Sequence, residues 1–263
     1  MMNSIRNKIA DSRPCLNGWS IMPSPLVIEA YARLGWDSVA IDMQHGWWDY
    51  AATVTALAIL QGLSVPSLVR VPTNEPGIVG RMLDAGASGI ICPMINSADD
   101  ARQLVRNALY PPVGERSCGP VRGAPFPPPA GNPQQDANRD ILLLLQIETV
   151  EAVGNAEAIM DMPGIGGFYV GPSDLGLSMG LPAKLDREEP ELLRIYEKLA
   201  AAARARGLIA GIHNHSAGYA RRMVDMGFDL VTVGSDLGHM VTNGLTDVRR
   251  FADAGEDVAA SAY

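Results

Sequence analysis

Two stretches of the sequence decide the fold class: residues 141–148, ILLLLQIE, and residues 167–174, GFYVGPSD. Each is a short apolar run that ends in polar side chains, and the first is too short to span a bilayer. Runs of this length are typical of buried strands in a parallel sheet. Residues 150–160, between the two runs, have helical spacing. The region therefore predicts a strand–helix–strand unit.

The same alternation occurs outward along the chain in both directions. We expect eight strands, at residues 15–21, 38–44, 64–71, 89–95, 141–147, 167–170, 209–213 and 230–234. We expect helices at residues 25–34, 50–61, 75–85, 98–110, 150–160, 191–206 and 217–226. Eight such units predict an α/β fold of the closed (β/α)8 TIM-barrel type, in a single domain over residues 1–263. An open doubly wound sheet is disfavoured because it has fewer strands, and no GxGxxG or GxxxxGK[ST] motif is present.

The composition indicates a compact globule that acts on small molecules. The chain has 263 residues, 47% of them hydrophobic, and a net charge of -8. This charge disfavours nucleic-acid and membrane partners, which attract basic surfaces. Cys15, Cys92 and Cys118 lack CxxC spacing, and the N-terminus lacks an apolar targeting segment, so we expect a cytoplasmic protein without disulfides. The Pro- and Gly-rich segment 111–138 alone interrupts the alternation, and long segments of this kind are often functional.

Polar residues at the ends of the predicted strands are candidates for the active site, because barrel enzymes place it there. Gln146 and Glu148 are two residues apart on an extended strand, so both side chains point the same way. Asp174 follows the next strand. Two carboxylates at neighbouring strand ends suit Mg2+ or Mn2+. Taken singly, Glu148 as a helix cap and Asp174 as a turn residue are the simpler interpretations, but their joint placement favours a metal site.

Other strand ends supply candidate groups for acid–base and anion-binding roles. His45 is a possible general base whose imidazole could be oriented by Asp42 or by another nearby carboxylate, and Arg70 offers a positive charge to a carboxylate or an oxyanion. Trp19, His213 and His215 also fall at strand ends. A lone histidine of this kind is more often a structural rim residue. None of the three lysines ends a strand, so a Schiff-base aldolase has no evident nucleophile, and a metal would have to stabilise an enolate.

Several short motifs together carry a resemblance that runs through almost the whole chain. They are Asp42-Met43-Gln44-His45-Gly46, Val69-Arg70-Val71-Pro72, Pro93-Met94, Tyr110-Pro111-Pro112 with Gly114 and Arg116, Gln146-Ile147-Glu148-Thr149, and Gly171-Pro172-Ser173-Asp174-Leu175. With these motifs the chain resembles the HpcH/HpaI aldolase family, the class II, metal-dependent pyruvate aldolases typified by 4-hydroxy-2-oxoheptanedioate aldolase.

The resemblance implies reversible cleavage of a 4-hydroxy-2-oxo acid to pyruvate and an aldehyde through a metal-bound enolate. Glu148 and Asp174 would hold Mg2+, Mn2+ or Co2+, with Arg70 on the keto oxygen and Gln146 near the oxo acid. His45 would be the base. The amides of Ser173 and Asp174 would receive the pyruvate carboxylate. The resemblance further implies a homo-oligomer, a hexamer or possibly a trimer, in which the last helix is exchanged between subunits and Asp84 reaches a neighbour's His45.

The chain departs from the family pattern at the aldehyde end. Gln44 stands where many members carry Glu, and Trp47 and Trp48 follow the first motif. Ser117 follows Arg116 where Gly is commoner in the family. His213 stands where the best-known members carry an aliphatic residue. A bulky or aromatic acceptor packed against Trp19 and Trp47 is one hypothesis, and packing of both in a subunit interface is the other.

Three alternative functions remain open on the sequence. Oxaloacetate decarboxylation, as in macrophomate-synthase-like members, uses the same pyruvate enolate. A zinc hydrolase built around His213-x-His215 is less favoured. The third alternative is a catalytically inactive binding or assembly subunit.

Overall fold

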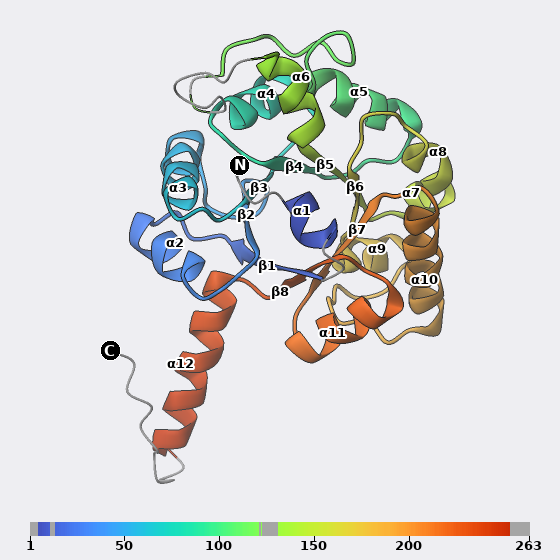
Figure 1. Cartoon of the computed structure of the whole chain (residues 1–263). Helices are drawn as coiled ribbons and strands as arrows, with labels where there is room; N and C mark the ends of the chain where they lie inside the picture. The colour runs from blue at the N-terminus through green and yellow to red at the C-terminus, as the bar shows by residue number, and fades with distance from the viewer. Residues whose placement is uncertain (1–4, 11–13, 121, 123–130, 253–263) are drawn as a thin grey trace.

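The computed structural model describes residues 5–10, 14–120, 122 and 131–252, and within them the chain forms a closed barrel (Figure 1). Each strand pairs in parallel with its sequence neighbours, and β8 closes onto β1. The strands are β1 (Cys15–Ser20), β2 (Ser38–Asp42), β3 (Ser67–Arg70), β4 (Gly89–Cys92), β5 (Leu142–Ile147), β6 (Gly167–Val170), β7 (Ile209–Asn214) and β8 (Leu230–Val233). The prediction of a (β/α)8 barrel is confirmed.

Helices surround the barrel, and seven predicted helical segments are confirmed within a few residues. They are α2 (Pro25–Ala32), α3 (Tyr50–Gly62), α4 (Pro76–Asp84), α5 (Ala98–Ala108), the pair α7 (Val150–Gly154) and α8 (Ala156–Met160), α10 (Pro190–Ala205) and α11 (Ala217–Met226). Periodicity did not predict four helices: α1 (Ile5–Ala10), α6 (Pro133–Asp140), α9 (Pro172–Ser178) and α12 (Asp236–Ala252). Side-chain caps start several helices, as Ser97 and Asp100 do for α5 in a reciprocal capping box.

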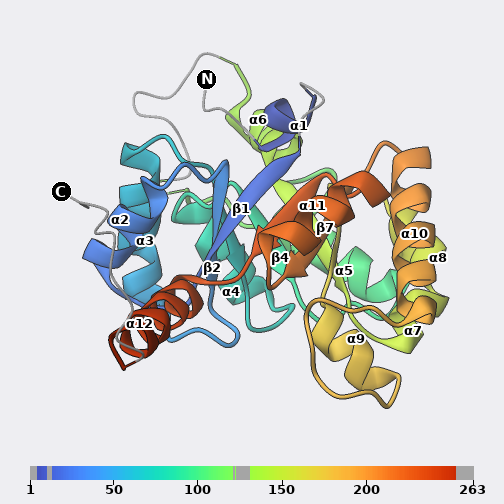
Figure 2. The ribbon, with the colours of Figure 1, turned by 90° about the horizontal axis from the view of Figure 1, so that it is seen from below.

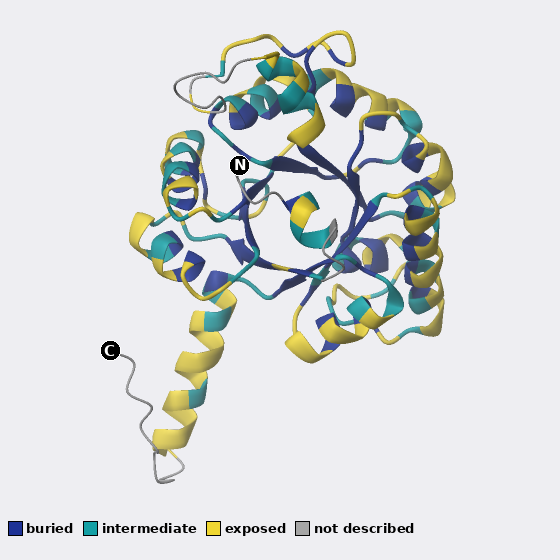
Figure 3. Cartoon of the chain, viewed as in Figure 1, coloured by how far each residue is buried: buried dark blue, intermediate teal, exposed yellow. Residues whose placement is uncertain are grey.

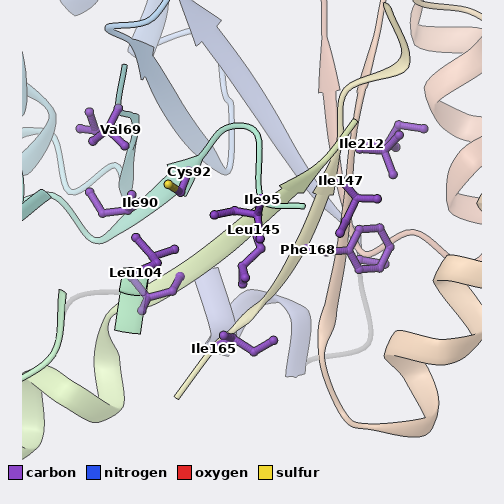
Figure 4. Packing of buried hydrophobic residues seen from close by; sticks show 14 of the residues in the cluster. Val69, Ile90, Cys92, Ile95, Leu104, Leu145, Ile147, Ile165, Phe168 and Ile212 are labelled. Atoms are coloured by element: carbon purple, nitrogen blue, oxygen red, sulfur yellow. The ribbon is translucent and has the colours of Figure 1, made fainter. Parts of the chain in front are cut away.

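Side-chain alternation along the strands divides the apolar core into two clusters. On β5, Leu143, Leu145 and Ile147 belong to the cluster between the strands and the helices. Figure 4 labels Leu145 and Ile147 within this cluster. Leu142 and Leu144 belong to the second cluster, inside the barrel. On β5 the inward positions near the strand start are thus filled by apolar side chains, and the next inward position is Gln146. Because the side chains alternate, burial of Leu142 and Leu144 inside the barrel also directs Gln146 toward the barrel axis, at the carboxyl end of β5.

The two ends of the barrel differ in how they are closed. Helix α1 covers the end where the strands begin, because Ile5 packs with Cys15, Leu142 and Leu230. Figures 1 and 2 show α1 over the barrel axis, with α9 and α12 at the opposite end. The carboxyl ends of the strands are therefore the end at which a ligand can enter.

Helix α12 projects away from the barrel, and Figure 3 shows it exposed beyond its first turn. Of its residues, Asp236 is buried, whereas Val241, Leu245, Val248 and Phe251 are exposed large apolar side chains. None of the helices in the described part of the chain combines the length and apolar character that a membrane span needs. In the described part of the chain Cys15, Cys92 and Cys118 form no disulfide; Cys15 and Cys92 are buried and Cys118 is exposed.

Candidate active site

Asp42, Arg70, Gln146 and Glu148, which were selected from the sequence, lie on the inward face at the carboxyl end of the barrel. Strand register pairs Asp42 of β2 with Arg70 of β3. Each lies two residues after an inward apolar residue, Ala40 or Leu68. Asp42, Gln146 and Glu148 are buried although they are polar. A set of buried polar groups at this end of a barrel is the usual arrangement of a catalytic centre.

Asp42 and Arg70 form a two-point ion pair. Arg70 Nε donates to Oδ1 at 2.8 Å and Nη2 donates to Oδ2 at 2.6 Å. The guanidinium also lies 4.8 Å from the ring centroid of Trp19, whose Nε1 donates to Asp42 Oδ2. Although burial alone would raise it, the pKa of Asp42 is lowered by Arg70 and by two main-chain amides. These bonds use Nε and Nη2, which leaves the Nη1 edge of the fork for a ligand.

His45 is exposed, and Asp42 orients its main chain and not its ring. Asp42 Oδ1 accepts hydrogen bonds from the amides of Gln44 and His45. The prediction that this carboxylate orients the imidazole is therefore corrected: the carboxylate is committed to Arg70 and to the turn after β2. The turn places the main chain of His45 beside the ion pair, and the residue is exposed.

Glu148 lies in a cradle made by three elements. Its Oε1 accepts from the amide of Met94, after β4, at 2.8 Å, and its Oε2 accepts from Gln146 Nε2. Met94 has a φ of 55°, a left-handed conformation that is uncommon for a residue with a side chain and recurs at functional sites. A Cβ at Gly171 would lie 2.5 Å from Glu148 Oε2, so a larger residue there would require the carboxylate to shift. The carboxylate is thus fixed from the β4, β5 and β6 ends.

The electrostatics of Glu148 favour a bound cation. Burial and the nearby negative charge of Asp174 raise the pKa of Glu148 to about 7, against the opposing effects of Met94, Arg70 and Gln146. The buried Oε1 atom of Gln146 has no hydrogen-bond partner among the described residues. Two carboxylates beside an unpartnered amide oxygen form a hard oxygen donor set, and Mg2+ is commonly held by one or two carboxylates together with substrate and water. The residues present therefore fit the predicted divalent cation.

Ser173 and Asp174 occupy the first turn of α9, directly after the Gly171-Pro172 turn. The first amide bonded within this helix is that of Leu175, which donates to the carbonyl of Gly171. The amides of Ser173 and Asp174 precede it and have no acceptor in the helix. The amino-terminal end of α9 thus presents main-chain amide donors beside the carboxylates of Glu148 and Asp174.

Trp19, Tyr169 and His213 form an aromatic wall next to the ion pair. The Trp19 ring stacks on Tyr169 at 5.9 Å and meets the edge of His213 at 4.7 Å. Burial, followed by the charge of Arg70, lowers the pKa of His213 to about 4. Trp19 is buried whereas Trp47 is 74% exposed. The two tryptophans therefore differ in burial: Trp19 packs against Tyr169 and His213 in the aromatic wall, whereas Trp47 lies at the surface.

The His213-x-His215 pair offers too few ligands for a zinc centre. Among the residues that the structure describes, no three His, Cys, Asp or Glu side chains are grouped to hold a metal. Catalytic zinc sites use three protein ligands. The main chain of His215 is instead tied to Asp186, which accepts from its amide at 2.7 Å. The hydrolase alternative therefore gains no support from the geometry.

Asp84 lies at the opposite end of the barrel from His45. Helix α4 runs back toward the start of β4, and Asp84 is its last residue. Its carboxylate pairs with the buried Arg116 at 2.5 Å, and Arg116 in turn lies over the ring of Tyr110. A single chain does not bring Asp84 to its own His45, and a contact with a neighbour's His45 stays a prediction.

Two supporting residues escaped the sequence reasoning. Asp236, buried at the start of α12, accepts from Ser20 Oγ and from the amides of Ile21 and Met22. The signal was available, because the segment 234–238, GSDLG, repeats the pattern of 171–176, GPSDLG. Arg187 is fully buried under α9, where it donates to the carbonyls of Pro172 and Pro182. No sequence pattern marks it.

Comparison with known proteins identifies the family. Residues 18–243 match the model of the family described as HpcH/HpaI aldolase/citrate lyase. The chain is 37% identical to a hydroxypyruvate/pyruvate aldolase of Rhizorhabdus wittichii, over 90% of this chain and 93% of that protein. Its structure matches an HpcH/HpaI aldolase of Desulfitobacterium hafniense with a TM-score of 0.86 and 26% identity, over 94% of this chain and 96% of that one. It also matches macrophomate synthase, with a TM-score of 0.81 and 26% identity, over 97% of this chain and 90% of that one. The chain therefore belongs to the HpcH/HpaI aldolase/citrate lyase family.

Proposed function

We propose that this protein is a carbon–carbon lyase that reversibly cleaves a 4-hydroxy-2-oxo acid to pyruvate and an aldehyde. The observation that carries the proposal is the buried Glu148, held between Met94, Gln146 and Gly171 beside the charge of Asp174. Burial and the charge of Asp174 raise the pKa of Glu148 to about 7, and a bound cation would favour its ionised form. The kinship with a hydroxypyruvate/pyruvate aldolase supports the choice of a 2-oxo acid.

Glu148 and Asp174 would hold the cation, which we propose to be Mg2+, Mn2+ or Co2+. When bound, it would act as a Lewis acid toward the oxygens of the 2-oxo acid and make the adjacent carbon more acidic. Gln146, fixed by its bond to Glu148, would contact the oxo acid through its free oxygen edge. The amides of Ser173 and Asp174 would receive the substrate carboxylate.

The remaining residues would move protons and balance charge. In cleavage, His45 takes the proton of the 4-hydroxyl group, the C3–C4 bond breaks, and the aldehyde leaves. The electron pair of that bond stays on the pyruvate unit as its enolate, and the Nη1 edge of Arg70 faces the developing oxyanion. A proton then returns to C3 to give the methyl group of pyruvate. Asp42 keeps Arg70 in place and does not itself touch the substrate.

Proton exchange at the methyl group of pyruvate tests this proposal without knowledge of the aldehyde. We expect exchange in D2O, followed by NMR, when Mg2+, Mn2+ or Co2+ is added to the chelated and dialysed protein. Glu148→Gln and Asp174→Asn should each lower the exchange rate at least about 100-fold, as loss of a charged group at such a site does. Glu151→Gln, an exposed change on α7, is the matched control. Full activity of both site variants after chelation and dialysis would disprove the metal assignment.

Oxaloacetate decarboxylation is the second candidate, favoured by the likeness to macrophomate synthase. It would use the same groups, with loss of CO2 in place of aldehyde release. Comparison of kcat/KM for oxaloacetate and for 4-hydroxy-2-oxo acids in one preparation separates the two. A higher value for oxaloacetate would assign the protein to decarboxylation.

We also propose that the protein assembles as a homo-oligomer, a hexamer or a trimer, through exchange of α12. Its exposed apolar residues Val241, Leu245 and Val248 follow one another at intervals of four and three, which places them on one face of the helix. Contiguous apolar surface of this kind is characteristic of protein interfaces. Assembly would also bring the Asp84 end of one barrel to the His45 end of a neighbour.

A further inference from the structure

The loop between β4 and α5, residues 93–97, supplies the main-chain amide that holds Glu148. This amide belongs to Met94, whose φ of 55° is a left-handed conformation. A residue with a side chain keeps such a conformation only where the surrounding structure enforces it. The Met94 side chain is half exposed, so its own packing gives limited support. Other residues of the loop must therefore direct the Met94 amide toward Glu148.

Asn96 ties this loop to three neighbouring segments. Its main-chain amide donates to Oδ2 of Asp100, in the first turn of α5, at 3.0 Å. Its side-chain Oδ1 accepts from the hydroxyl of Thr149, the residue that follows Glu148. Its carbonyl accepts from Nδ2 of Asn155, between α7 and α8, at 2.8 Å. Asn96 thus links the loop after β4 to the segment after β5.

Strand pairing gives this loop little further support. The register of β4 against β5 ends at Cys92 and Leu145. Beyond it, the amide of Ile95 donates to the carbonyl of Gln146 at 3.4 Å, which is long for a hydrogen bond. The bond from Thr149 therefore secures the loop at the point where the main-chain pairing weakens.

We propose that Asn96 is a positioning residue for the cation site, because it holds Met94 in the conformation that directs its amide at Glu148. The proposal rests on the cation site of Glu148 and Asp174 proposed above. The two oxygens of the Glu148 carboxylate accept from Met94 and from Gln146, and each oxygen keeps a further lone pair for a cation. If the loop shifts, the carboxylate loses one of the two bonds that orient it, and a cation must order the side chain on binding.

Binding of Mn2+ to the chelated and dialysed protein tests the proposal without substrate or turnover. EPR of the free Mn2+ gives Kd. We expect Asn96→Ala to raise Kd at least about tenfold, as loss of a residue that orients a metal ligand does. Asn138→Ala is the matched control, because Asn138 is also partly buried and bonds to the main chain of Tyr110, a segment without a bond to Glu148. Its Kd should equal that of the wild type.

Variants of Thr149 test the same link from the other side. Thr149→Val removes the donor to Asn96 and should also raise Kd about tenfold. Thr149→Ser keeps the hydroxyl group and should bind Mn2+ as the wild type does. Because Thr149 also caps α7, Ser24→Ala serves as a control: it removes a side-chain cap of the same kind from α2 and should leave Kd unchanged.

Met94→Gly tests whether Asn96 acts through the main-chain conformation of residue 94. Glycine adopts the left-handed conformation without a steric penalty, so at this position it needs less support from the loop. Met94→Gly combined with Asn96→Ala should therefore bind Mn2+ at least about threefold more tightly than Asn96→Ala alone.

Urea unfolding of the metal-free protein separates positioning from structural support alone. If Asn96→Ala lowers the free energy of unfolding but binds Mn2+ as the wild type does, Asn96 only stabilises the loop, and the proposal is wrong while the cation site stands. The proposal is also wrong if Met94→Gly recovers no affinity in the double variant. If the wild type binds no Mn2+, or if Glu148→Gln binds it as tightly, the cation assignment itself is wrong, and the role of Asn96 fails with it.

Discussion

Arg70 and Asp42 meet as a planar, two-point ion pair, with Nε to Oδ1 at 2.8 Å and Nη2 to Oδ2 at 2.6 Å. Both side chains are largely buried, so removal of one partner leaves the other uncompensated. We expect Arg70→Ala to lower the free energy of unfolding by about 3 to 5 kcal/mol. The same change should also abolish turnover, because the Nη1 edge is lost.

The double variant separates the two roles of Arg70. Arg70→Ala combined with Asp42→Asn should regain much of the stability, since no charge stays buried, but none of the turnover. Urea unfolding and the pyruvate exchange rate measure the two effects. A double variant that is no more stable than Arg70→Ala would contradict this account of the pair.

Gly171→Ala should displace the carboxylate of Glu148 from its place beside Asp174, with little effect on the rest of the fold. The added Cβ would lie 2.5 Å from Glu148 Oε2 and 2.8 Å from Gln146 Nε2, so the carboxylate must move. Displacement of a reacting group by about 1 Å can lower the rate about 100-fold. We expect a loss of that order in metal-dependent exchange. Gly77→Ala on α4, where an added Cβ meets nothing within 4 Å, serves as the control and should keep normal rates.

Acid should destabilise the protein partly through His213. Burial and Arg70 lower its pKa to about 4, below its ordinary value of about 6.5. Between these values the unfolded chain binds more protons than the folded one, so stability falls as pH drops from about 6.5 to 4. We expect His213→Gln to remove about 2 kcal/mol of the stability lost between pH 8 and pH 5. Equal losses in wild type and variant, measured by urea unfolding, would show that the imidazole is not held neutral.

Arg187 should prove important for α9 although it lies outside the active site. Its guanidinium packs so closely under Gly176 that a Cβ there would overlap Nη2, and it satisfies the carbonyls of Pro172 and Pro182. Arg187→Met should lower the free energy of unfolding by roughly 2 to 3 kcal/mol and raise KM for pyruvate through α9. Arg222→Met breaks an exposed ion pair with Glu188 and should cost less than about 1 kcal/mol.

Charge on the apolar face of α12 should prevent assembly. Leu245→Asp together with Val248→Asp places two carboxylates among exposed apolar residues that we propose to be covered in the oligomer. We expect sedimentation equilibrium to show a monomer, with activity reduced because no neighbour supplies Asp84. Asp247→Ala on the same helix should keep the wild-type mass. A wild-type protein that is itself monomeric would rule out the proposed exchange.

Local sequence determined most of the barrel. Successive side chains of the extended run 141–148 point to opposite faces of the sheet, into the two core clusters in turn. Gln146 and Glu148, two residues apart, therefore face the same way. Helices with a strong apolar stripe, such as α5 and α11, were also evident from their spacing. The short helix α9 gave no period long enough to recognise. Helix α12 was hidden because its apolar face has no partner in the described chain.

What only the tertiary structure decided are the contacts between strand ends. The sequence identified Asp42, His45 and Arg70 as candidates, but the register of β2 against β3 joined the carboxylate to Arg70 instead of the imidazole. The amide of Met94 reaches Glu148 across 54 positions of the chain, and Trp19 meets His213 only where β1 and β7 approach the barrel axis. Side-chain direction follows from local backbone geometry, whereas such pairs depend on barrel closure, which fixes strands far apart in sequence against one another.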